Sequence, residues 1–181
     1  MTATPIVGVK NILPLILLAS AAFAADEATV PSAKAACGPD NARFKVKAIQ
    51  GQRPAAQPQT GKALVYVVED HIRKPGDIGK PTIRVGVDGS WIGANRSTSY
   101  LFFAVDPGEH HLCTDWQSAP GWISPKVSLT SFTADAGKVY YFRARVVVGG
   151  TTPTLDLEPI NSDEGQLLIT NSPLSEYRRK K

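Results

Sequence analysis

Short segments with an alternating or fully apolar pattern recur along the chain, separated by glycine, proline and aspartate. Their spacing of about 8–12 residues is typical of short strands joined by turns, and it leaves almost no room for helix. We expect seven or eight strands from the following segments: 44–48, 63–68, 83–87, 91–93, 100–105, 110–116, 127–133, 138–148 and 154–160.

Two of these segments also predict which side chains face the core. Residues 63–68 are apolar on both faces, so this segment is expected to be a central strand covered on both sides. In the segment 138–148, every second residue from Tyr140 onward is apolar and is expected to face the core. Tyr141, Arg143 and Arg145 then share the other face, which we interpret as solvated, with a basic binding stripe as the alternative.

Turn and cap residues mark the connections. Asp88-Gly89 between two alternating segments predicts a tight hairpin, because such turns need positive φ. The residues 106–109 read Asp-Pro-Gly-Glu, a turn after which 110–116 is expected to continue as the partner of 100–105. Ser162 followed by two acids resembles a helix N-cap, so residues 165–170 are expected to form a short helix.

This pattern predicts an all-β fold, an antiparallel β-sandwich of about seven or eight strands with a short C-terminal helix. The expected organisation is a signal peptide at 1–24, an N-terminal arm and Pro-rich linker at 25–62, the sandwich domain at 63–171 and a basic tail at 172–181.

The first 24 residues have the order of a secretory leader. Lys10 precedes an apolar run, and Ala22-Phe23-Ala24 is a cleavage signal of small residues. The run of about a dozen residues is too short to span a bilayer. We therefore expect export to the periplasm or beyond the cell after cleavage near Ala24, with no transmembrane segment.

Two cysteines, Cys37 and Cys113, remain after the leader. An even number of cysteines in an exported chain favours a disulfide. The bond would close a loop of about 77 residues and contribute roughly 4 kcal/mol through the entropy of the unfolded chain.

The net charge of +4 comes from the C-terminal end of the chain, where residues 178–181 read Arg-Arg-Lys-Lys. We interpret this basic tail as a solvated terminus, with contact to phosphate or anionic lipid as the alternative. The glycines form no phosphate-binding fingerprint, so neither a nucleotide cofactor nor a nucleic-acid partner is expected.

Five short blocks with strand and turn residues follow one another between residues 63 and 148. They are 63–67 (ALVYV), 83–93 (IRVGVDGSWIG), 99–103 (SYLFF), 106–110 (DPGEH) and 137–142 (GKVYYF). In these blocks the chain resembles the bacterial domain-of-unknown-function family 2846. The resemblance implies an exported β-rich domain and no particular reaction. Lipid-anchored members of that family have a cysteine at the cleavage site, which this chain lacks.

The segment His110 to Asp115 holds the one dense group of possible metal ligands. On a strand, His111, Cys113 and Asp115 point one way and His110 the other. His110, His111 and Asp115 are thus a candidate zinc or copper site, although Cys113 is no ligand if it is oxidised. A structural interpretation of these residues is favoured, and no cofactor is expected.

A hydrolytic site is a weaker alternative. The chain has three histidines, at 71, 110 and 111, and no Gly-x-Ser-x-Gly motif around a nucleophile. Neither the Asp88 turn nor the acids at 163 and 164 forms an evident acid–base pair.

Aromatic residues near the predicted turns are candidates for binding. The candidate residues are Trp91, Trp116, Trp122, Tyr100 and Tyr141, together with Arg143 and Arg145. Exposed aromatic rings stack on sugars or anchor protein partners, whereas buried ones complete a core. We expect a non-catalytic envelope module that binds a protein or glycan partner. A periplasmic metal-binding protein is the first alternative and a small secreted hydrolase the second; the sequence does not indicate the oligomeric state.

Overall fold

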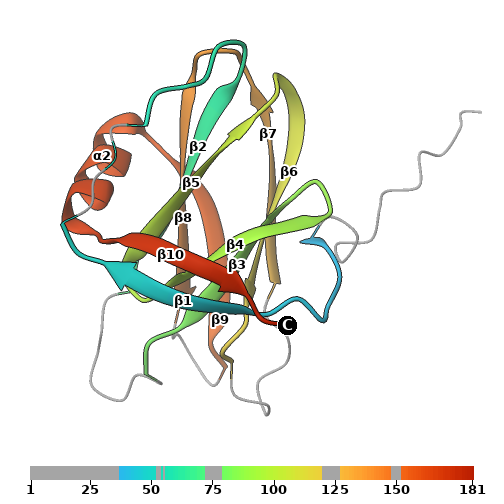
Figure 1. The fold of residues 1–181 in the computed structure, drawn as a ribbon, viewed down its shortest axis with the longest axis vertical. Coiled ribbons are helices and arrows are strands. Elements are labelled where there is room, and N and C mark those ends of the chain that lie inside the picture. Colours follow the sequence, from blue (N-terminus) through green and yellow to red (C-terminus); the bar gives the residue numbers. More distant parts are fainter. Residues whose placement is uncertain (1–36, 52–53, 55, 72–78, 120–126, 148–151) are drawn as a thin grey trace, which may run out of the picture. The chain divides into compact units, whose positions relative to one another are not determined.

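The fold was analysed in a computed structural model, which describes residues 37–51, 54, 56–71, 79–119, 127–147 and 152–181. The leader predicted at 1–24 therefore lies outside the described residues. Ten strands and one helix follow in chain order (Figure 1). They are β1 (Phe44–Ile49), β2 (Ala63–Glu69), β3 (Thr82–Val87), β4 (Ser90–Arg96), β5 (Ser99–Val105), β6 (Gly108–Trp116), β7 (Val127–Ala134), β8 (Val139–Val147), β9 (Thr154–Ile160), α2 (Ser162–Asn171) and β10 (Leu174–Arg179).

The strands form two sheets, so the expected all-β, sandwich-like class is confirmed. The larger sheet has the order β1-β10-β5-β2-β8-β9 and the smaller one the order β4-β3-β6-β7. The expected count of seven or eight strands is too low, and the expected antiparallel pairing holds only in part. In the larger sheet, β2 pairs with β8 and β10 pairs with β5 in parallel.

Strand β2 is the centre of the larger sheet, as its apolar pattern predicts. All seven of its residues are buried. Ala63, Val65 and Val67 face the main core, which both sheets line with further apolar side chains. These include Ile83 and Val85 of β3, Leu112 and Trp116 of β6, and Phe142 and Ala144 of β8. The core therefore lies between the two sheets.

The other face of β2 is buried by a second apolar layer under the helix α2. This layer contains Leu64, Tyr66 and Val68 of β2 together with Tyr100. The helix contributes Leu168 and Ile169 to the same cluster. The predicted helix is present, but Ser162 is its first residue and not its N-cap, so the cap lies one residue earlier than expected. Asn161 is its N-cap, and the Asn161 side chain accepts a hydrogen bond from the Glu164 amide.

The Asp88-Gly89 turn is confirmed, because both residues have positive φ, 49° and 79°, between the antiparallel strands β3 and β4. The pairing expected after the 106–109 turn is wrong. Strand β5 pairs with β2 and β10 in the larger sheet, whereas β6 pairs with β3 and β7 in the smaller one. The turn at Pro107 thus carries the chain from one sheet to the other.

The C-terminal segment is not a solvated tail. Residues 174–179 form β10, which pairs antiparallel with β1 over six residues, from Phe44 opposite Arg179 to Ile49 opposite Leu174. Both strands lie outside the predicted sandwich range of 63–171, yet both belong to the larger sheet. The pattern concealed β10 because five of its six residues carry a charge or a hydroxyl group.

Within the described residues, no helix is both long enough and apolar enough to cross a membrane.

Candidate functional site

The outer face of the smaller sheet carries the disulfide that the cysteine count predicted. Cys113 lies on β6, and Cys37 lies in the arm before β1, with a Cα–Cα distance of 5.1 Å. Both side chains are buried. Gly86 of β3 is opposite Cys113, and a Cβ atom there would lie 2.6 Å from the carbonyl oxygen of Cys37. A glycine at position 86 therefore lets the arm cross the sheet in close contact.

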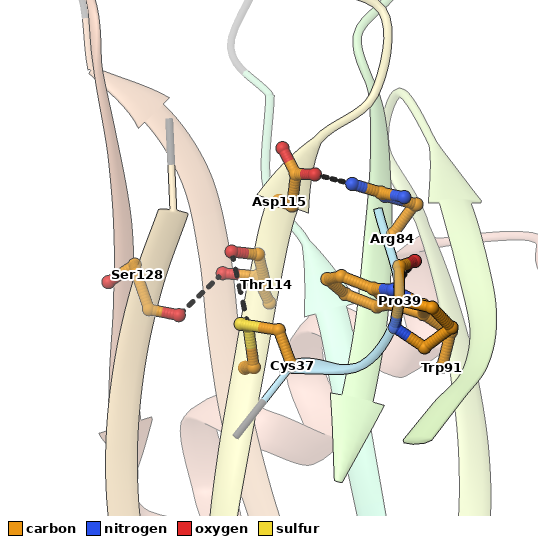
Figure 2. Close-up of a disulfide and its surroundings, with 8 residues drawn as sticks. Cys37, Pro39, Arg84, Trp91, Thr114, Asp115 and Ser128 are labelled. Carbon is orange, nitrogen blue, oxygen red and sulfur yellow. Dashed lines mark hydrogen bonds and ion pairs between the residues drawn. A yellow bond between two sulfur atoms is a disulfide. The ribbon is translucent and has the colours of Figure 1, made fainter. Parts of the chain in front are cut away.

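Arg84 of β3 lies beside the arm and pairs with Asp115 (Figure 2). Its buried guanidinium donates hydrogen bonds to the carbonyl oxygens of Ala42, at 2.5 Å, and Asp40, at 3.2 Å. It also forms an ion pair with Asp115 of β6. Burial, together with the charge of Arg43, lowers the Arg84 pKa to about 10. The group remains a cation at neutral pH, which two backbone carbonyls and one carboxylate stabilise.

Trp91 of β4 completes this arrangement. Its indole Nε1 donates to the Pro39 carbonyl at 2.9 Å, and the Arg84 guanidinium lies 4.2 Å from its ring centroid. We call Cys37, Pro39, Arg84, Trp91, Cys113 and Asp115 the arm clasp. These residues fix the arm to the sheet, so Trp91 and Asp115 already have structural partners.

Beside the arm clasp, part of the outer face is uncovered. In the register of β6 and β7, Cys113 lies opposite Leu129, Asp115 opposite Val127, and His111 opposite Ser131. Val127 and Leu129 are 41% and 40% exposed, although both are aliphatic. We call Val127, Leu129, Ser131 and His111 the β6–β7 row. Three residues of the row lie on β7. This strand is at the edge of its sheet, where it is hydrogen-bonded to β6 on one side only.

His110 is turned away from this row and lies in a separate network of turn residues. Its Nδ1 is 2.7 Å from the Asp88 carboxylate, and its Nε2 is 2.7 Å from the Asp106 carbonyl oxygen. Partial burial opposes the charge on this ring, but the bonds to Asp88 and Asp106 outweigh it and raise the His110 pKa. Two acceptors require both ring nitrogens to donate, so this geometry selects the imidazolium form.

The predicted metal ligands are therefore not brought together. His110 binds the two turns, Asp115 pairs with Arg84, Cys113 is in the disulfide, and His111 is exposed. His111 and Asp115 are four residues apart on one strand, a separation of about 13 Å. Among the residues that the structure describes, no group of three His, Cys, Asp or Glu side chains is close enough to hold a metal ion.

The aromatic candidates are mostly core residues. Trp116 and Tyr100 are buried, and the Trp116 indole donates to the Ser118 hydroxyl. Tyr141 stacks on Tyr66 with the ring centroids 5.4 Å apart. Trp122 lies outside the described residues. The described part of the chain thus offers no open platform of the predicted aromatic residues to a sugar ring.

Arg143 and Arg145 do not form a free basic stripe either. Arg143 pairs with Glu158 and Glu164, and Arg145 pairs with Asp156 and Glu158. Partial burial disfavours the charge of Arg143, but Glu158 outweighs it and raises the Arg143 pKa. The acids of β9 were not considered as partners in the sequence, because only the pairing of β8 with β9 places them opposite the arginines.

Two important residues were missed by sequence reasoning. Arg84 is buried, although a single charged residue between branched apolar residues in the segment 83–87 does not indicate this. Glu69 was overlooked at the end of β2, where a carboxyl directly following a fully apolar run was the available signal.

Comparison with known proteins gives one match. The family model described as "Protein of unknown function (DUF2846)" matches residues 59–155. This range holds β2 to β8 and the arm clasp from Arg84 onward, whereas β1, α2 and β10 lie outside it. No curated protein matches the chain significantly. No solved structure does so either.

Proposed function

Since the chain belongs to the DUF2846 family of proteins of unknown function, we propose its function from its own geometry. The protein is a non-catalytic module that works outside the cytoplasm and binds a protein partner through the β6–β7 row. The observation that carries this proposal is the exposure of Val127 and Leu129 on β7, an edge strand of the smaller sheet, beside the arm clasp.

The use of the reactive side chains supports a non-catalytic role. A general base needs a ring nitrogen that can accept a proton, but both nitrogens of His110 are engaged as donors. Asp88 accepts from His110 and from the His111 amide. Asp115 and Cys113 belong to the arm clasp. In the described part of the chain, these groups stabilise the fold rather than converge on a reacting atom.

Two features support work outside the cytoplasm. The first 24 residues have the order of a secretory leader, and Cys37 and Cys113 are joined at disulfide distance. Disulfides persist in oxidising compartments and are rare in the cytosol. The chemistry of the pair thus agrees with the compartment that the leader pattern predicts.

The kind of exposed side chain favours a protein over a glycan. Glycan sites use exposed Trp and Tyr rings, whereas the β6–β7 row presents two aliphatic side chains, one hydroxyl group and the imidazole of His111. An edge strand also offers unpaired backbone groups, to which an extended segment of a partner can add as a further strand. Aliphatic side chains beside such an edge give that partner apolar surface to bury.

Site-specific photo-crosslinking in the native envelope tests the proposal. A photoreactive residue at position 129 of the full chain is expected to form a discrete protein adduct, because the row contacts the partner. The matched control places the same residue at position 163, which is exposed on the helix α2. Val127→Asp is expected to reduce the adduct formed at 129 at least tenfold.

The proposal is contradicted if the photoreactive residue at position 129 forms no more protein adduct than the same residue at position 163. If the purified chain instead binds envelope polysaccharide, and Val127→Asp does not weaken that binding, the glycan alternative replaces it.

A further inference from the structure

A dense group of positive charges lies on β1 and β10 and on the residues that flank them. The two strands are far apart in the sequence but paired in one sheet (Figure 1). We call this group the basic ribbon. Its members are Arg43, Lys45, Lys47, Arg178, Arg179, Lys180 and Lys181. The pairing of β1 with β10 brings the two clusters together, so the basic ribbon exists only in the folded protein.

All seven side chains of the basic ribbon are exposed. The ion pairs of the described residues involve other cations: Lys62, Arg84, His110, Arg143 and Arg145. By comparison, Arg143 and Arg145 on β8 are neutralised by ion pairs with acids on the neighbouring strand β9. On the basic ribbon one carboxylate, Glu176, accompanies seven cations.

The strand register opposes like charges at one position, whereas Lys47 lies opposite Glu176. Lys45 is the direct partner of Arg178 across the β1–β10 ladder. Like charges at directly opposed positions destabilise a sheet. A solvated tail would let these charges separate, whereas β10 holds them in place. The fold thus maintains a concentrated positive charge at a cost in stability.

The charge of the whole chain is distributed unevenly as a result. Seven cations and one acid give the basic ribbon and its Glu176 a net charge of +6, while the complete chain has +4. The difference leaves −2 for all other residues. A one-sided field of this kind orients a protein toward an anionic surface.

We propose that the basic ribbon is a docking surface for an anionic phospholipid membrane. Lys45, Lys47 and Arg178 are exposed on one face of the paired strands, which suits several weakly bound head groups rather than one ligand held in fixed geometry. Single-stranded nucleic acid would need aromatic rings for base stacking, and the row of Lys45, Lys47 and Arg178 has none on its face.

This inference goes beyond the proposed protein-binding function and does not depend on it. The basic ribbon lies on β1 and β10 of the larger sheet, and the β6–β7 row lies on the smaller sheet. Variants of one surface therefore leave the other surface unchanged.

Vesicle co-sedimentation of the full chain tests the inference. Vesicles of equal parts phosphatidylglycerol and phosphatidylcholine are compared with pure phosphatidylcholine, which measures any charge-independent binding by the apolar residues 12–23. Replacing Lys45, Lys47 and Arg178 by Gln together is expected to weaken binding to the anionic vesicles about 100-fold, roughly fivefold for each charge removed. Binding of the unchanged protein is expected to fall as salt is added.

The matched control removes the same charge elsewhere, by Gln at the exposed cations Lys80, Arg96 and Lys138. Binding by this control is expected to change by less than about threefold, because these three cations are not members of the basic ribbon. Lys45→Glu is a second variant that places opposite charges across the ladder. We expect it to weaken vesicle binding while its thermal midpoint stays equal or rises, which separates lost binding from lost folding.

Equal binding by the ribbon variant and its control overturns the inference. The inference is also overturned if, at the same salt concentration, the protein binds a duplex oligonucleotide more tightly than the anionic vesicles and the ribbon variant loses that binding. The basic ribbon would then be a nucleic-acid-binding surface. In both cases an unchanged photo-adduct at position 129 leaves the protein-binding proposal standing.

Discussion

At the scale of single residues, Glu69 is the most unusual position. It ends β2, and its side chain is 0% exposed. Burial raises its pKa well above the ordinary value, and the Ser97 backbone and the charge of Arg96 offset this only in part. A carboxyl in such surroundings is more stable protonated than ionised.

Glu69→Gln is therefore expected to stabilise the protein at high pH and not at low pH. Near pH 4 the carboxyl is largely protonated in both states. As pH rises, the unfolded chain loses the proton first, so the free energy of unfolding of the wild type falls until the raised pKa of the folded state is passed. At pH 8 we expect the variant to be more stable by about 1–3 kcal/mol.

Urea unfolding at pH 4 and pH 8 measures this difference. Glu176→Gln, which removes an exposed carboxylate, is the control and should show a much smaller change between the two pH values. Parallel pH profiles for wild type and Glu69→Gln would contradict the prediction.

At the scale of elements, His110 ties two turns together. It joins Asp88 at the tip of the β3–β4 hairpin to the Asp106 carbonyl in the β5–β6 turn. Lys62, just before β2, pairs with the Asp106 carboxylate at 2.7 Å and adds a third segment. Burial opposes ionisation of Asp88, yet hydrogen bonds from His111 and His110 lower its pKa. The network is thus most stable when His110 is charged and Asp88 is ionised.

This network predicts a loss of stability at mildly alkaline pH. The raised pKa of His110 means that its contribution is fully present below the unfolded value near 6.5 and is lost as pH rises through the folded value. His110→Gln is expected to cost about 0.5–1 kcal/mol at pH 5.5, and less at pH 8.5, because the pair is partly exposed.

Unfolding free energies at these two pH values check the prediction. His111→Gln is the matched control, since the side chain of His111 is exposed on the opposite face of β6. A constant difference between wild type and His110→Gln at both pH values would show that the ring contributes by packing and not by charge.

At the scale of the whole molecule, the Cys37–Cys113 disulfide links residues 76 positions apart. Much of the larger sheet and nearly all of β3 to β6 lie within this loop. The rest of the arm clasp adds to it, because Arg84 and Trp91 bind the backbone of residues 39–42. The arm is therefore part of the folded domain, although its sequence resembles a linker.

Replacing both cysteines by serine is expected to lower the free energy of unfolding by about 4 kcal/mol, through the entropy gained by the unfolded chain. Chemical unfolding under oxidising conditions measures the loss, and the reduced wild type should match the double variant. Equal stability of the oxidised wild type and the double variant would show that Arg84 and Trp91 hold the arm without the disulfide.

The sequence was sufficient for what depends on neighbouring residues. Apolar patterning located segments of β1 to β9, although the expected count was seven or eight strands, because side chains alternate locally on a strand. Positive φ at Asp88 and Gly89 and the presence of the helix α2 follow from the chemistry of a few adjacent residues, although the cap is Asn161 and not Ser162. The cysteine count led to Cys37 and Cys113 because the chain offers one possible intramolecular pair.

Only the tertiary structure decided how distant segments meet. It placed β10 between β1 and β5, which made a basic ribbon out of an expected tail. It buried Trp116 and Tyr100, and it set the acids of β9 opposite Arg143 and Arg145. Strand order and register are set by packing across the whole chain, so local pattern cannot specify them. Whether a charged or aromatic side chain is free to bind depends on that packing.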